Sequence, residues 1–96
     1  MPYISRDDRH LIRPEPIQTL VHDLGRITSS RRKGAVNYVI SRIVLGAMEP
    51  RSYHSISDAV SVLRDAAAEI ERRLMGPRED VAIENNGDLP EYEGLL

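Results

Sequence analysis

Apolar residues recur every three or four positions between residues 56 and 74, and this is the clearest periodic pattern in the chain. Such spacing places side chains on one face of a helix. Ser55 or Ser57 can cap its start, and Gly76 followed by Pro77 is typical of a helix end. The pattern therefore predicts a long helix over residues 57–75. The apolar face comprises Ile56, Ala59, Val60, Leu63, Ala67, Ile70 and Leu74.

Two earlier segments also favour helices. Pro14-Glu15-Pro16 is a favourable helix start, and the apolar residues after it recur at helical spacing as far as Ile27. Residues 35–48 are apolar on nearly all sides and rich in β-branched residues, so a buried strand is the alternative. Their length favours a helix. We expect the intervening Arg31-Arg32-Lys33-Gly34 to form a connection, which gives an all-α fold of three main helices.

The two ends of the chain are expected to add little regular structure. Ser5 and Asp8 have the spacing of a capping box, which predicts a short helical turn over residues 6–11. Residues 77–96 hold six acidic residues and one basic residue, and they include the turn-forming sequence Asn85-Asn86-Gly87-Asp88. We therefore predict a helical domain over residues 1–76, followed by an acidic, irregular C-terminal tail over residues 77–96.

The composition suggests a single small domain that needs a second copy. The 96 residues include no Phe and no Trp, so the core must be built from aliphatic side chains and four Tyr. Because so small a core gives little margin of stability, we expect a homo-oligomer. A dimer formed through the apolar faces of the second and third helices is favoured. The absence of Cys and of any apolar run of about 20 residues favours a cytoplasmic protein, with no membrane segment.

No grouping of residues in the sequence has the spacing of a catalytic or metal-binding motif. His10, His22 and His54 lie in three different segments, and the six glycines form no phosphate-binding loop. We therefore expect a protein that is not an enzyme, with no catalytic residues, cofactor or metal ion. The basic run at residues 31–33 is the one feature that favours nucleic acid. Because the net charge is -2 and stacking aromatics are few, nucleic-acid binding is an unfavoured alternative.

Three short motifs carry a family resemblance. Met1-Pro2-Tyr3-Ile4 opens the chain, Val36-Asn37-Tyr38-Val39-Ile40-Ser41 lies in the middle, and Ile83-Glu84-Asn85-Asn86-Gly87-Asp88 lies near the end. In their order they resemble the MPYI, LNYVIT-like and IEENGD-like motifs of a family of small, functionally unassigned proteins from bacteriophages and bacteria. The resemblance implies a phage-type accessory protein, located in the host cytoplasm if a phage encodes it, and it implies no particular activity.

The same motifs indicate which residues are candidates for recognition. If the aromatic and polar motif residues belong to one pattern, we expect them to meet in space. The leading interpretation is a protein that binds and modulates a host or phage macromolecule, most simply an unidentified host or phage protein. The alternative is a small-molecule binder that sequesters a nucleotide-like signal between subunits, with an arginine on phosphate and a tyrosine on the base. The candidate recognition residues are Tyr3, Arg31, Arg32, Lys33, Asn37, Tyr38, Arg42, Asn86 and Asp88.

Overall fold

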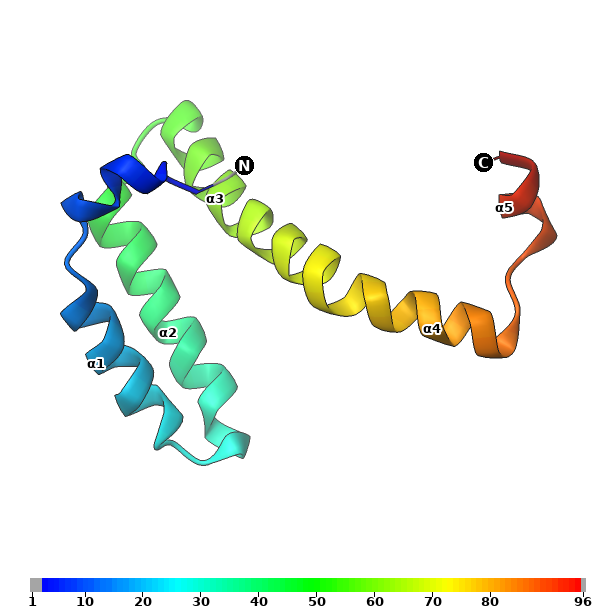
Figure 1. Ribbon diagram of the computed structural model, residues 1–96. Helices are drawn as coiled ribbons and strands as arrows, with labels where there is room; N and C mark the ends of the chain where they lie inside the picture. Colours follow the sequence, from blue (N-terminus) through cyan, green and yellow to red (C-terminus); the bar gives the residue numbers. More distant parts are fainter. Residues whose placement is uncertain (1–2, 96) are drawn as a thin grey trace. The chain divides into compact units, whose positions relative to one another are not determined.

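The computed structural model describes residues 3–95, and their regular secondary structure is entirely helical (Figure 1). The all-α prediction is therefore confirmed. The chain divides into two compact units, unit 1 (Met1–Val60) and unit 2 (Ser61–Leu96). Unit 1 contains the 3₁₀ helix η1 (Arg6–Leu11), α1 (Pro14–Gly25), α2 (Ser29–Met48) and the beginning of α3 (Tyr53–Ile70). Unit 2 contains the rest of α3, the π-helical segment η2 (Glu71–Met75), α4 (Gly76–Asn86) and α5 (Pro90–Leu95).

The N-terminal turn and α1 lie where the sequence predicts them. Ser5 Oγ donates to Asp8 Oδ2 at 3.0 Å, and the Asp8 amide donates to the Ser5 carbonyl at 3.1 Å, which begins η1. The helix α1 starts at Pro14, whose fixed φ suits a first helical position and whose missing N–H is not needed there. Met1 and Pro2 of the MPYI motif lie outside the described residues.

The helices α1 and α2 pack against each other as a helical hairpin, seen in Figure 1 as the blue and green pair. The predicted connection at residues 31–34 is wrong, because α2 already begins at Ser29. The Thr28 carbonyl accepts the amides of Arg31 at 2.9 Å and Arg32 at 3.0 Å, and long basic side chains favour helix. At the other end Glu49 adopts a left-handed conformation, with φ of 43°, and stops the helix before Pro50.

A reciprocal capping box of two serines begins α3. The Ser55 amide donates to Ser52 Oγ at 3.1 Å, and the Ser52 amide donates to Ser55 Oγ at 2.9 Å. Ser55 Oγ also accepts the Arg51 amide at 2.9 Å. Two amides that the helix leaves unpaired, and one before it, are thereby satisfied. The cap is therefore Ser52, with Ser55 as its reciprocal partner; Ser57, an alternative in the sequence, makes no such contact.

Removing this cap should lower stability measurably. We expect Ser52→Ala to reduce the free energy of unfolding by about 1 kcal/mol, since an N-cap hydroxyl contributes about that amount. Urea denaturation followed by circular dichroism measures the change. Ser57→Ala is the matched control, and we expect it to be neutral or slightly stabilising because alanine favours helix. Equal losses in the two variants would contradict the assignment of the cap.

The predicted helix end at Gly76-Pro77 and the predicted irregular tail are both wrong. A proline inside an α-helix lacks a donor for the carbonyl four residues earlier and its ring clashes with that carbonyl. The π-helical segment η2 precedes Pro77, and the Gly76 amide donates to the Glu71 carbonyl, five residues back. This wider turn reorganises the hydrogen bonding before the proline. The chain therefore continues as α4, and residues 77–95 are largely helical.

Unit 2 contains two further local features. Arg72 and Arg73 both donate to the Glu69 carboxylate, the closest atoms being 3.0 and 2.8 Å apart, and these hydrogen bonds, Arg72's foremost, lower the pKa of Glu69. After α4, Pro90 and Glu91 provide a proline and an acidic residue in the first turn of α5. The C-terminal region is acidic, as the sequence shows, but it is helical because acidic residues are compatible with a helix.

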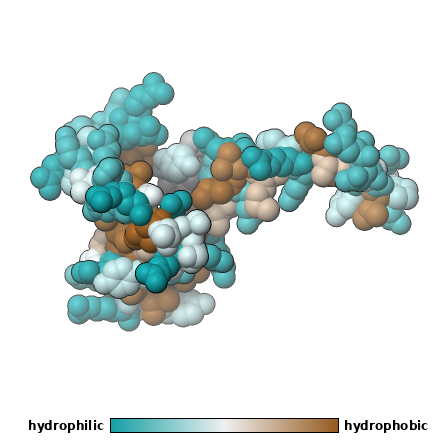
Figure 2. All heavy atoms as spheres, turned by 90° about the horizontal axis from the view of Figure 1, so that it is seen from below, coloured by the Kyte–Doolittle hydropathy of each residue, from teal (hydrophilic) through white to brown (hydrophobic). Residues whose placement is uncertain are grey.

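Very little of either unit is buried. Within residues 3–95 only Ala59 is almost fully covered, with 5% of its surface exposed. The chain exposes 8898 Å², whereas two separate compact globules of these sizes would together expose about 6,600 Å². Figure 2 accordingly shows apolar side chains at the surface among polar ones. The helices therefore form without enclosing the apolar faces that the sequence pattern provides.

Candidate interaction surface

The α1–α2 hairpin has a hollow that contains two of the predicted recognition residues. Its volume is about 470 Å³, and it is lined by Leu20 of α1 and by Tyr38, Val39, Arg42 and Ile43 of α2. Three aliphatic side chains thus surround one aromatic ring and one guanidinium group. Such a lining suits a flat or apolar group that carries negative charge.

Tyr38 and Arg42 are four residues apart on α2 and therefore share one face of the helix. The guanidinium carbon of Arg42 lies 5.8 Å from the centroid of the Tyr38 ring, and Arg42 Nη1 donates to the Tyr38 hydroxyl at 3.4 Å. Tyr38 remains 62% exposed. An exposed cation–π contact is worth about 0.5–1 kcal/mol. The contact therefore orients the two side chains while leaving them accessible.

Asn37 lies beside this pair in the sequence but forms a separate contact. Its Oδ1 accepts a hydrogen bond from Ser41 Oγ at 3.2 Å, again four residues along the helix, and Asn37 is exposed. Both polar residues belong to the LNYVIT-like motif. Asn37 and Ser41 of the motif are therefore hydrogen-bonded to each other along α2.

The basic run has a structural role that the sequence does not reveal. Arg32 reaches back to the end of α1, where Nη2 donates to the carbonyls of Gly25 at 3.0 Å and Ile27 at 2.9 Å, and Nε donates to Ile27 at 3.2 Å. Carbonyls at a helix C-terminus lack partners within the helix and carry partial negative charge. Arg32 therefore ties the end of α1 to the beginning of α2, while the side chains of Arg31 and Lys33 make no such bond among the described residues.

Loss of this arginine should loosen the hairpin. We expect Arg32→Ala to cost about 1–2 kcal/mol in the free energy of unfolding, because hydrogen bonds from a charged donor are stronger than neutral ones. Chemical denaturation provides the measurement. Arg31→Ala removes the same charge from the neighbouring position, and we expect it to change stability by less than about 0.5 kcal/mol. Identical effects would show that charge alone, and not the bridge, matters.

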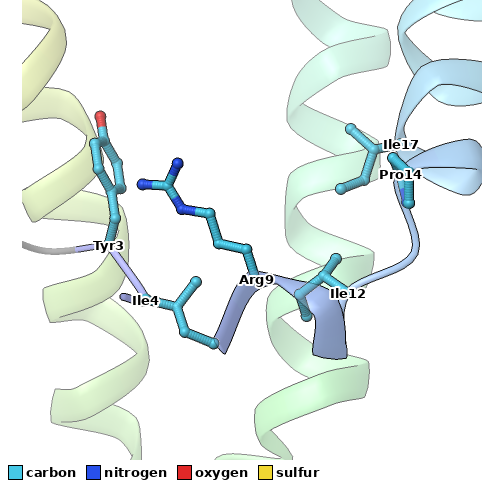
Figure 3. Close-up of a pocket in the computed structure, with 6 residues that line it drawn as sticks. All are labelled: Tyr3, Ile4, Arg9, Ile12, Pro14 and Ile17. Carbon is cyan, nitrogen blue, oxygen red and sulfur yellow. The ribbon is translucent and has the colours of Figure 1, made fainter. Parts of the chain in front are cut away.

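A second hollow lies in the N-terminal part of unit 1. It has a volume of about 680 Å³ and is lined by Tyr3, Ile4, Arg9, Ile12, Pro14 and Ile17. Figure 3 shows the Arg9 guanidinium directed toward the end of the hollow at which Tyr3 lies. Sequence reasoning identified Tyr3 but missed Arg9, because no spacing in this short segment indicates where the arginine points. Tyr3 and Tyr38 thus line different hollows.

The remaining candidates, Asn86 and Asp88, belong to unit 2 and line neither hollow. Asn86 is the last residue of α4, and Gly87 follows with φ of 88°, a conformation that favours glycine. The Gly87 amide donates to the Ile83 carbonyl at 2.7 Å, and Asp88 Oδ1 accepts the Leu89 amide at 2.7 Å. The IEENGD-like motif therefore ends one helix and leads into the next.

Ionisable side chains are dispersed over the described residues. Residues 3–95 contain no group of three or more His, Asp or Glu that could hold a metal ion. Two of the histidines have local partners: His10 Nδ1 lies 2.8 Å from the Asp7 carbonyl, and His54 lies 3.5 Å from Asp58. No helix in the same part of the chain combines the length and apolar character needed to cross a membrane.

The fold and its surface define a small all-α protein with an exposed helical hairpin and apolar helix faces. The chain belongs to the family described as a domain of unknown function, DUF6899, whose profile matches residues 1–89. This agrees with the motif resemblance to a functionally unassigned family. The match ends immediately before α5. No curated protein and no solved structure matches the chain.

Proposed function

We propose that this chain is a non-enzymatic interaction protein that assembles with a second copy of itself and binds a host or phage protein. The exposed apolar side chains on every long helix carry this proposal. Val21 of α1, Leu45 of α2 and Ile70 of α3 are 66%, 60% and 59% exposed. Covering a side chain of this kind stabilises a complex by about 1.5–3 kcal/mol. Contiguous apolar faces on helices are a common feature of protein interfaces.

A second copy is the simplest first partner. Two identical chains related by a twofold axis present the same apolar face to each other, so one surface serves both subunits. Because residues 3–95 bury almost no apolar side chain, this assembly has a role in stability as well as in recognition. The phage or host protein is then recognised by surfaces that the assembly leaves open, and the exposed Tyr38–Arg42 pair is a candidate contact.

Sedimentation velocity over about a hundredfold range of protein concentration tests the proposal. We expect the weight-average sedimentation coefficient to rise with concentration to the value of a dimer. A coefficient that stays at the monomer value over the whole range would overturn it.

The Arg42 contact with Tyr38 also supports a second candidate function, the binding of a nucleotide-like small molecule. The hollow beside this pair, at about 470 Å³, falls within the range of about 300–1,000 Å³ typical of small-molecule sites. Arg42 would pair with phosphate, and the Tyr38 ring would stack on the base. Nucleic-acid binding is favoured less, because Arg32 is already occupied at the end of α1.

Under this second candidate, Tyr38→Ala should weaken binding of AMP, used as the probe, by about five- to 150-fold. Stacking of a base on an aromatic ring is worth about 1–3 kcal/mol. Isothermal titration calorimetry measures the dissociation constant. Tyr38→Phe should retain binding because the ring remains, and Tyr53→Ala, at a residue that is 91% exposed, should have no effect. Unchanged binding by Tyr38→Ala would remove this residue from the site.

A further inference from the structure

Unit 2 carries an apolar stripe whose spacing is that of paired helices. Leu63, Ala67, Ile70 and Leu74 are separated by four, three and four residues. In an α-helix this alternation corresponds to a period of 3.5, which keeps one face directed at a partner helix. Leu63, Ala67 and Ile70 lie in α3, and Leu74 lies in the π-helical segment η2 that follows it. The three large side chains are 41%, 59% and 63% exposed in sequence order, and Ala67 is exposed as well. The stripe therefore has the pattern of a coiled-coil seam and is largely uncovered.

Two opposite charges flank this seam. Arg64 and Glu71 directly follow Leu63 and Ile70, so they occupy equivalent positions beside it, seven residues apart. Neither side chain makes a hydrogen bond or ion pair among residues 3–95. Glu69, by contrast, is engaged by Arg72 and Arg73. The flanking charges of the seam are therefore available to an intermolecular partner.

We propose that this seam pairs with the seam of a second copy in antiparallel orientation. The inference rests on the self-assembly proposed above and specifies its surface. In this register Leu63 packs against the partner's Leu74, and Ala67 packs against the partner's Ile70, so a small residue faces a large one. The same register places Arg64 of each copy beside the partner's Glu71. Twofold symmetry repeats every contact, which gives two complementary ion pairs.

The charges disfavour the parallel alternative. In a parallel pair, a residue beside one edge of the seam approaches a residue of the partner. That residue lies five positions later in the sequence, beside the opposite edge of the partner's seam. Ala66 would then face the partner's Glu71, so a parallel pair keeps Arg64 and Glu71 apart and leaves both without a charged partner. The antiparallel register instead brings Arg64 of each copy beside Glu71 of the other. The flanking charges therefore favour the antiparallel orientation, in which they attract each other.

Charge exchange in the full chain tests the ion pairs. We expect Arg64→Glu or Glu71→Arg alone to weaken dimerisation about tenfold, because two attractions become repulsions. The double variant Arg64→Glu/Glu71→Arg should recover affinity to within about twofold of the original. Sedimentation equilibrium measures the dissociation constants. Glu79→Arg, at an exposed acidic residue of α4 away from the seam, is the control and should have little effect.

The outcomes separate this inference from the proposed function. A dimer that is insensitive to both single exchanges would overturn the pairing through this seam while leaving self-assembly intact. Failure of the double variant to recover affinity would overturn the facing of Arg64 and Glu71. A monomeric original chain would overturn both proposals.

Disulfide trapping tests the orientation independently. Because the sequence contains no cysteine, introduced cysteines are the only ones that can cross-link. Leu63 and Leu74 are separated by about 16 Å along a helix. An antiparallel pair therefore links Leu63→Cys with Leu74→Cys only when the two variants are mixed. We expect the cross-linked dimer in the oxidised mixture and not in either variant alone. Efficient linking of Leu63→Cys to itself would indicate a parallel pair and overturn the inference.

Discussion

Ile70→Asp should convert the self-associated protein to a monomer. Ile70 is 59% exposed in the single chain and lies in the middle of the seam. The substitution removes an apolar contact worth about 1.5–3 kcal/mol from each copy and introduces a charge at the same place. Because about 1.4 kcal/mol corresponds to a factor of ten, the dissociation constant should rise at least about a hundredfold. Sedimentation equilibrium measures it.

Val62→Asp provides the matched control for this experiment. Val62 lies on the same helix, is 48% exposed, and falls outside the spacing of the seam. We expect this variant to dimerise as the original chain does. Circular dichroism should show that both variants remain helical. Equal weakening by the two substitutions would mean that overall apolarity, and not the seam, drives association.

Ala59→Glu should destabilise unit 1 strongly. Ala59 is 5% exposed and is the one residue in the described part of the chain that is almost fully covered. A larger charged side chain there must either displace its neighbours or lose its hydration. We expect the free energy of unfolding to fall by about 2–4 kcal/mol, measured by chemical denaturation.

Ala68→Glu tests whether this effect belongs to the buried position. Ala68 lies on the same helix and is exposed. A glutamate there should change stability by less than about 0.5 kcal/mol, because it meets only solvent. A similar loss at both positions would show that the burial of Ala59 does not explain the effect.

The positions of the helices follow from the sequence where one local rule decides the outcome. Apolar spacing after Pro14 gives α1, and the length of the apolar segment ending at Met48 distinguishes helix from strand. The region around Pro77 could not be predicted in this way. Gly and Pro usually end a helix, but a π-helical segment before the proline allows the helix to continue. The π-helical segment depends on the hydrogen bonds of several consecutive turns, so no single residue in the sequence predicts it.

For the candidate interaction surface, too, the sequence predicts only the contacts that local spacing decides. Tyr38 and Arg42 share a helix face because they are four residues apart, so their contact follows from spacing once the helix is assigned. Arg32 reaches seven residues back to Gly25, and only the geometry of the hairpin reveals that contact. The meeting of Tyr3 with Tyr38, expected from the motifs, is not observed, because the two line different hollows.

Native mass spectrometry of the gently purified full chain is the most direct test of the central claim, that the exposed apolar faces are covered by a second copy. We expect a mass of twice the chain. Additional mass of a few hundred daltons would identify a bound small molecule and favour the Tyr38–Arg42 hollow as its site. A spectrum containing only the monomer would contradict the account, provided that a control protein known to form a weak dimer is seen as a dimer under the same conditions.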